Sequence, residues 1–197
     1  MILKKPNMNS RNLNIKTKIT NGDWTLFLDR DGVINRRLVD DYVKKTSEFE
    51  FLPGVLDAVS VFSEKFNHVF IVTNQQGVGK GLMTSEDVGL IHSQMLSEIS
   101  SKGGNIDKVY FCPDLANSNS PNRKPEIGMA IQAQKDFPEV DFSKSIMVGD
   151  SKSDMEFGRK AGMLCIFIET EQKNPFSADL VDLSFGSLWE FALAINK

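Results

Sequence analysis

The chain carries the stretch WTLFLDRDGVIN at residues 24–35. The apolar run 24–28 predicts a buried strand, and two carboxylates, Asp29 and Asp31, follow it two residues apart. In extended backbone, residues i and i+2 face the same way, so one carboxylate can attack an electrophile while the other handles a proton. Gly32 lets the chain turn sharply just beyond the strand. A paired acid at the carboxyl end of a strand is therefore a candidate site.

Asp-x-Asp alone also fits a solvated turn or an adventitious cation site. Three further segments place polar or charged residues at the end of an apolar run or just before a helix. A second apolar run at 69–72 ends in a hydroxyl and an amide, which are short donors suited to a phosphoryl oxygen. Residues 122–125, NRKP, supply two cations before a predicted helix. A third run at 146–148 closes on Gly-Asp, with another acid four residues later. Together the four segments favour a functional site.

In chain order these segments give a carboxylate pair, Thr-Asn, Lys and Gly-Asp-x-x-x-Asp. This pattern resembles the haloacid dehalogenase (HAD) superfamily of phosphatases over roughly residues 24–170, and the joint match is more specific than any single motif. Within the superfamily the motif sequences look most like those of the D-glycero-D-manno-heptose 1,7-bisphosphate phosphatases, and the histidinol-phosphate phosphatases share many of the same residues. The resemblance implies an α/β, Rossmann-like, three-layer α/β/α sandwich with a mostly parallel sheet and no large cap domain.

The pattern of apolar residues predicts the same alternation of strands and helices. We expect strands at 24–28, 69–74, 109–112, 146–148 and 165–168, and helices over 55–66, from a capping box at Thr84 to about 99, 126–135 and 188–195. In a parallel sheet ligands bind beyond the carboxyl ends of the strands, where all four motifs fall. About forty residues separate the first two motifs, which leaves no room for a large lid. We expect an open site shaped by 35–50 and 113–122.

Composition favours a compact enzyme, because 197 residues with 41% apolar content can bury one core and 25% charged residues keep it soluble. The formal charge of −3 argues against a nucleic-acid partner. No apolar run approaches the ~20 residues that span a membrane, and the N-terminus lacks the apolar core of a secretion signal. Two widely separated cysteines make no disulfide framework, so a reducing cytoplasm is expected. We expect a monomer or weak dimer.

The chain divides into two compositional zones. Residues 1–22 carry five Lys or Arg before the first acid, Asp23, and form a basic extension that is partly disordered or an edge strand. A basic docking arm is the functional alternative to a solvated leader. Residues 23–197 are predicted to form one HAD-like phosphatase domain.

The resemblance implies a role for each acidic residue. Asp29 would be the nucleophile that forms an aspartyl-phosphate, and Asp31 would protonate the leaving alcohol and then activate water. Mg²⁺ would bind the carboxylates of Asp29 and Asp150 and the backbone carbonyl of Asp31. Asp154 would support this metal shell from outside, or it is an ordinary first-turn acid favoured by the helix dipole.

The remaining site residues are predicted to contact the substrate. Thr73 and Lys124 would stabilise the transferring phosphoryl group. The substrate-binding residues would be Asn74, Gln75, Gln76, Arg123 and Ser151. Arg123 has a fork suited to a second phosphate or a polar substrate. Asp40, Asp41 and Tyr42 align loosely with a substrate loop of the heptose enzymes, and a solvated loop explains them equally well.

The resemblance therefore implies a Mg²⁺-dependent phosphomonoester hydrolase acting on a small phosphorylated metabolite. A sugar bisphosphate is favoured, namely heptose 1,7-bisphosphate losing its C7 phosphate. The alternatives are a histidinol-phosphate phosphatase, which would want acids at the distal end of its site, and a non-catalytic scaffold that binds phosphorylated ligands. Retention of both Asp29 and Asp31 argues against the scaffold.

Other polar residues are predicted to have structural roles. Many relatives carry a zinc-binding Cys/His cluster before Arg-Lys-Pro, but this chain offers only Cys112 there, and Cys165 stands far along the sequence. Because structural zinc needs four ligands of N or S type, no structural zinc is expected. Arg30 should point to the opposite side of its strand from the two acids. His92, on the capped helix, needs no catalytic role.

Overall fold

The structure, a computed structural model, describes residues 19, 23–169, 176 and 179–196. Within these residues the strands are β1 (Thr25–Leu28), β2 (His68–Asn74), β3 (Lys108–Cys112), β4 (Ser145–Gly149), β5 (Leu164–Ile168) and β6 (Leu183–Phe185). They form one six-stranded sheet in the order β3-β2-β1-β4-β5-β6, and every neighbouring pair is parallel. The predicted parallel α/β fold is confirmed.

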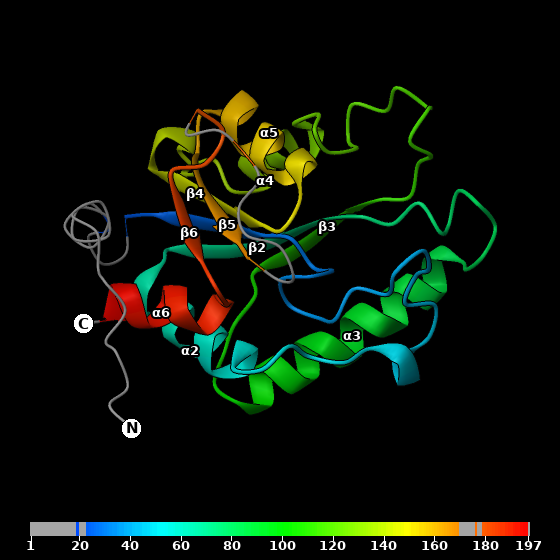
Figure 1. Cartoon of the computed structure of the whole chain (residues 1–197), viewed down its shortest axis with the longest axis horizontal. Coiled ribbons are helices and arrows are strands. Elements are labelled where there is room, and N and C mark those ends of the chain that lie inside the picture. The colour runs from blue at the N-terminus through cyan, green and yellow to red at the C-terminus, as the bar shows by residue number, and fades with distance from the viewer. Residues whose placement is uncertain (1–18, 20–22, 170–175, 177–178, 197) are drawn as a thin grey trace.

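Helices cover both faces of the sheet, which gives three layers (Figure 1). They are α2 (Val55–Lys65), α3 (Ser85–Ser101), α4 (Gly128–Asp136), α5 (Lys152–Ala161) and α6 (Leu188–Asn196), with short 3₁₀ turns η1 (Thr46–Glu48) and η2 (Phe142–Lys144). In Figure 1, α2, α3 and α6 lie on one side of the sheet, and α4 and α5 lie on the other.

The alternating side chains of β1 explain how one strand serves both cores. Leu26 and Leu28 pack into the larger apolar cluster with α2, α3 and α6, whereas Phe27 packs into the cluster with α4 and Phe157 of α5. All three side chains are fully buried, as expected for a central strand of a parallel sheet. The strand is therefore fixed on both faces just before Asp29.

The ends of the helices match those predicted from the sequence only in part. The predicted capping box is present at the start of α3, where the Asp87 backbone N–H donates to Thr84 Oγ1 and the Asp87 carboxylate accepts the Thr84 backbone N–H. The helix predicted at 126–135 begins at Gly128 instead. The three-residue strand β6 was not predicted, and neither was the extent of α5.

The predicted N-terminal extension lies almost entirely outside the residues that the structure describes. The basic extension and its edge strand lie outside the described residues except for Ile19, which is buried.

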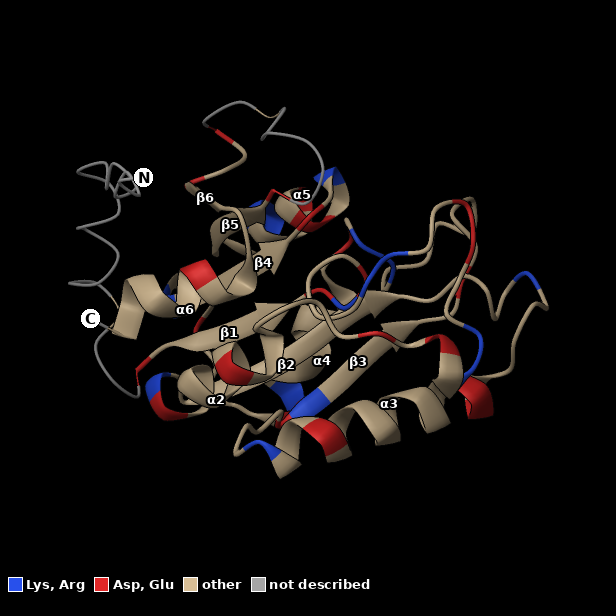
Figure 2. Ribbon diagram, turned by 60° about the horizontal axis from the view of Figure 1, so that its bottom comes forward, with Lys and Arg blue, Asp and Glu red and all other residues tan. Residues whose placement is uncertain are grey.

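The charged residues of both signs are intermixed: in Figure 2, acidic and basic residues both occur on helices and loops. No helix among the described residues is long and apolar enough to cross a membrane.

Candidate active site

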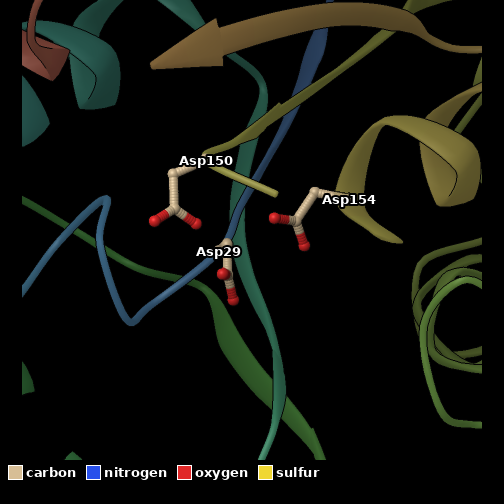
Figure 3. Close-up of side chains that lie close together, drawn as sticks. All are labelled: Asp29, Asp150 and Asp154. Carbon is tan, nitrogen blue, oxygen red and sulfur yellow. The ribbon is translucent and has the colours of Figure 1, made fainter. Parts of the chain in front are cut away.

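The site lies where the sheet reverses its strand order, between β1 and β4. Asp29 directly follows β1, Asp150 directly follows β4, and Asp154 stands in the first turn of α5. Figure 3 shows these three side chains converging from separate segments. Each offers an oxygen within 4.8 Å of the others, so the cluster could hold a metal ion.

The crowding of these buried carboxylates changes their proton affinities. Burial, followed by the charge of Asp154, raises the pKa of Asp29 to about 6. Burial, followed by the charge of Asp29, raises the pKa of Asp150 to about 8. Carboxylates that raise one another's pKa in this way favour a neighbouring cation.

Lys124 supplies one such cation inside the protein. Its Nζ lies 2.8 Å from Asp29 Oδ1 and 2.6 Å from Asp154 Oδ1, and it donates to the backbone oxygen of Val72 at 2.7 Å. The side chain is only 2% exposed, so its charge acts in a poorly solvated environment. Asp154 also accepts the Ser151 backbone N–H at 3.0 Å, so it both caps α5 and holds Lys124.

Asn74 holds the main chain of Lys124 on both sides. Its Oδ1 accepts the Lys124 N–H and its Nδ2 donates to the Lys124 carbonyl, both at 3.0 Å. The sequence predicted that this amide would contact substrate, and the structure shows that it also places the main chain of Lys124. A second hydrogen on Nδ2 remains for other acceptors.

The carboxylate of Asp31 is held by three neighbouring side chains. Asn35 Nδ2 donates to Oδ1 at 2.9 Å, Gln75 Nε2 donates to Oδ2 at 2.8 Å, and Arg30 Nη2 reaches both oxygens at 3.1 and 3.0 Å. Burial raises the pKa of Asp31, but the charge of Arg30 and these hydrogen bonds outweigh it and lower the pKa. Asp31 is thus an oriented anion.

Arg30 does not point away from the acids as the sequence suggested. Extended backbone ends at Leu28, and the Arg30 carbonyl accepts the N–H groups of Ile34 and Asn35 in a turn. Alternation therefore no longer fixes the side-chain direction, and the buried guanidinium folds back onto Asp31.

Arg37 is a site residue that sequence reasoning missed. Its Nη2 lies 2.6 Å from Asp150 Oδ1, 3.0 Å from the Asp31 carbonyl oxygen and 3.9 Å from Asp29 Oδ2. One cation thus reaches all three of the oxygen donors predicted for a metal. Its place in an aperiodic loop, 113 residues before Asp150, gave no sequence signal.

A cavity of about 290 Å³ is lined by most of these residues. The predicted site residues that line it are Asp29, Asp31, Thr73, Asn74, Gln75, Gln76, Arg123, Lys124, Ser151 and Asp154. Asp150 instead borders a second cavity of about 640 Å³, and Arg37 borders both. Asp29 thus borders the smaller cavity and Asp150 borders the larger one.

Several predicted substrate contacts also organise the walls of the smaller cavity. Gln75 Nε2 donates to Thr73 Oγ1 at 2.8 Å as well as to Asp31. Gln76 Nε2 donates to the Tyr42 hydroxyl at 2.8 Å, and its Oε1 accepts the Ala116 N–H at 3.3 Å. Gln76 therefore links the loops 35–50 and 113–122, both predicted to shape the site.

The region predicted to lack zinc contains one thiol and oxygen groups. Cys112 Sγ lies 3.5 Å from Asp114 Oδ2 and 3.8 Å from Ser120 Oγ. Arg123 Nη1 donates to the Asp114 carbonyl at 3.1 Å, which fixes its guanidinium against the same loop.

Comparison with known proteins identifies the family of the chain. The HAD-hydrolase-like family model matches residues 121–183. The chain is 40% identical over 176 residues to the D-glycero-alpha-D-manno-heptose-1,7-bisphosphate 7-phosphatase of Mycobacterium bovis, with 88% of this chain and 92% of the relative covered. It is 38% identical over 157 residues to the D-glycero-beta-D-manno-heptose-1,7-bisphosphate 7-phosphatase of Rhodopseudomonas palustris, covering 76% and 86%.

A solved structure is similar over the same extent. The D,D-heptose 1,7-bisphosphate phosphatase from B. bronchiseptica, complexed with magnesium and phosphate, superposes with a TM-score of 0.79 at 27% identity. The match covers 88% of this chain and 98% of that one. The chain therefore belongs to the D-glycero-D-manno-heptose 1,7-bisphosphate 7-phosphatase family of HAD phosphatases.

Proposed function

We propose that this phosphatase removes the C7 phosphate of D-glycero-D-manno-heptose 1,7-bisphosphate with the help of Mg²⁺. The observation that carries the proposal is the cavity lined by Asp29, Asp31 and Lys124, in which Lys124 Nζ donates to Asp29 Oδ1 at 2.8 Å. The names of the relatives, which include enzymes for both anomers, support the substrate.

In the first step, an oxygen of Asp29 attacks phosphorus and the bond to the sugar oxygen breaks. The product is an aspartyl-phosphate and an alcohol that takes its proton from Asp31. The lowered pKa of Asp31 makes it an anion before substrate arrives. The negative charge of a phosphate dianion beside Asp31 raises the pKa of its carboxylate, so Asp31 takes up a proton from solvent and can then act as the general acid.

In the second step, Asp31 accepts a proton from water as that water attacks phosphorus. The bond between phosphorus and Asp29 breaks, which restores the Asp29 carboxylate and releases inorganic phosphate. The three side chains that hold Asp31 keep its carboxylate in one orientation for both transfers.

Lys124 and Thr73 would stabilise the phosphoryl group during both steps. Lys124 is bound to the nucleophile through Nζ, so its charge lies beside the phosphorus that Asp29 attacks. The Thr73 hydroxyl already accepts a hydrogen bond from Gln75, which leaves its own proton free to donate to a phosphoryl oxygen.

The residues present fit a magnesium ion. Asp29 and Asp150 would hold it through carboxylates and Asp31 through its carbonyl, and the reach of Arg37 to these three oxygens supports a common point between them. When bound, Mg²⁺ would neutralise the phosphoryl oxygens as the anionic nucleophile approaches. Asp154 supports the site through Lys124.

The distal end of the cavity would receive the second phosphate. Arg123 and Tyr42 line this cavity with Gln76. A guanidinium suits a phosphate better than it suits the amine of histidinol phosphate. We therefore favour a sugar bisphosphate over histidinol phosphate as the substrate.

Phosphate release from a substrate panel tests the proposal. The panel contains both heptose 1,7-bisphosphate anomers, fructose 1,6-bisphosphate, histidinol phosphate and 4-nitrophenyl phosphate, each with Mg²⁺, and Asp29→Asn serves as the nucleophile control. We expect the highest kcat/KM for a heptose bisphosphate and its loss in Asp29→Asn. Preference for histidinol phosphate would overturn the substrate, and metal-dependent binding without turnover would overturn the reaction.

A further inference from the structure

Arg30 is a buried cation whose position is set by two partners. It is 1% exposed, its Nη2 contacts both Asp31 oxygens, and its Nη1 lies 3.1 Å from His92 Nε2. Its Nε has no hydrogen-bond partner among the described residues. A buried guanidinium needs its remaining acceptors, because each polar group left unpaired away from water is costly.

His92 has the chemistry of an acceptor for Arg30. It lies on the buried face of α3 and is 7% exposed, with its ring edge-on to Phe111 at 5.8 Å. Burial, followed by the charge of Arg30, lowers the pKa of His92 to about 3. The imidazole is therefore neutral, and since Arg30 keeps its protons, Nη1 donates to the Nε2 lone pair.

This contact extends the catalytic site into a helix far from it in sequence. Position 92 lies 62 residues after Arg30, and its neighbours Ile91 and Met95 on α3 are apolar and fully buried. An apolar side chain would satisfy that core equally well. A histidine there is explained by the guanidinium it holds, which in turn grips the carboxylate of Asp31.

We propose that His92 is a positioning residue that aligns Asp31 for proton transfer by fixing the Arg30 guanidinium. The inference rests on the proposed function, in which Asp31 protonates the leaving sugar oxygen. Asn35 and Gln75 each hold one Asp31 oxygen, whereas Arg30 spans both and sets the plane of the carboxylate. Without His92, the guanidinium would turn to satisfy Nη1 elsewhere and the carboxylate would turn with it.

The test compares two leaving groups in the magnesium-loaded enzyme. A sugar alkoxide needs a proton from Asp31 to depart, whereas 4-nitrophenolate departs without one. The ratio kcat/KM reports the chemistry only up to the departure of the leaving group, so it separates this step from hydrolysis of the aspartyl-phosphate. The variants are His92→Phe and His92→Leu, which lack an acceptor, and His92→Gln, whose amide oxygen can accept from Arg30. Ile91→Val is the matched control on the same buried face.

We expect both acceptor-free variants to lose at least about tenfold in kcat/KM on the sugar phosphate and less than about threefold on 4-nitrophenyl phosphate. His92→Gln should restore most of the sugar-phosphate activity, and Ile91→Val should leave both substrates unchanged. Equal losses on the two substrates in folded variants, or no loss on either, would overturn the inference alone. A wild-type enzyme inactive on every phosphomonoester would instead overturn the proposed function, and the inference with it.

Discussion

Arg37 Nη2 lies 2.6 Å from Asp150 Oδ1, and Arg37 is nearly half exposed. The same nitrogen contacts the Asp31 carbonyl oxygen and approaches Asp29, so the guanidinium shares the oxygen donors proposed for magnesium. Two positive charges gathered on the same oxygens repel each other. We therefore expect metal binding to displace Arg37, and the loss of its ion pair with Asp150 to weaken the apparent metal affinity.

Replacing Arg37 should tighten metal binding. We expect Arg37→Gln to lower the apparent dissociation constant for Mn²⁺ or Mg²⁺ by about three- to tenfold, because the competing cation is gone. Titration calorimetry, or the EPR signal of free Mn²⁺, measures this without turnover. Arg36→Gln is the matched control, since Arg36 pairs with the exposed Glu50 and should leave metal affinity unchanged. Weaker metal binding in Arg37→Gln would contradict this competition.

Removing the charge of Lys124 should affect both stability and catalysis. Lys124→Met leaves Asp29 and Asp154 buried without their shared cation, which should lower the free energy of unfolding by about 3 kcal/mol. Turnover should fall by roughly 10²-fold or more. Urea denaturation and steady-state kinetics measure the two effects. Lys160→Met removes an exposed pair with Glu126 and should stay within about 0.5 kcal/mol of wild type. A fully stable Lys124→Met enzyme would refute this account of the buried cluster.

The central strands could be predicted from sequence because each is an apolar run that ends in a polar motif. Leu26 and Leu28 face one helical layer and Phe27 the other, so continuous hydrophobicity marks a strand buried on both faces. The edge strand β6 has only three residues, two of them half-buried, and gives no comparable signal. Period and hydrophobicity identify the middle of this sheet better than its edge.

Contacts formed across the fold could not be predicted from local spacing. The resemblance to the HAD superfamily covers whole motifs, and it predicted one common site for Asp29, Lys124 and Asp150. The contact of Arg37 with Asp150 depends on how an aperiodic loop folds over the sheet. The direction of Arg30 was wrong because alternation holds only in extended backbone, and the chain has left that conformation.

Two glycines with positive φ provide a test of how Asp150 is placed. Gly32 has φ 93° and a Cβ there would collide with the Asp150 carboxylate, whereas Gly81 has φ 69° and open space around its Cα. Substitution by Ala should cost about 1 kcal/mol or more of stability at either site, because L side chains disfavour this conformation. Only Gly32→Ala should also weaken metal binding, by about tenfold or more, since Asp150 must move. Calorimetric titration and thermal denaturation separate the two effects, and equal metal affinities would exclude a role for Gly32 in placing Asp150.

Gln76 should determine how well the cavity retains a bisphosphate. Its amide bridges Tyr42 and the Ala116 backbone, so Gln76→Leu should loosen both substrate loops. We expect KM for the preferred sugar bisphosphate to rise about tenfold with kcat little changed, because binding of the distal phosphate contributes to affinity and takes no part in bond breaking. The KM for 4-nitrophenyl phosphate, which has no second phosphate, should stay within about twofold. Gln94→Leu, on the exposed side of α3 where Gln94 bonds Glu98, should change neither substrate. A fall in kcat shared by both substrates would instead mean that Gln76 acts on the reacting groups through its neighbour Gln75.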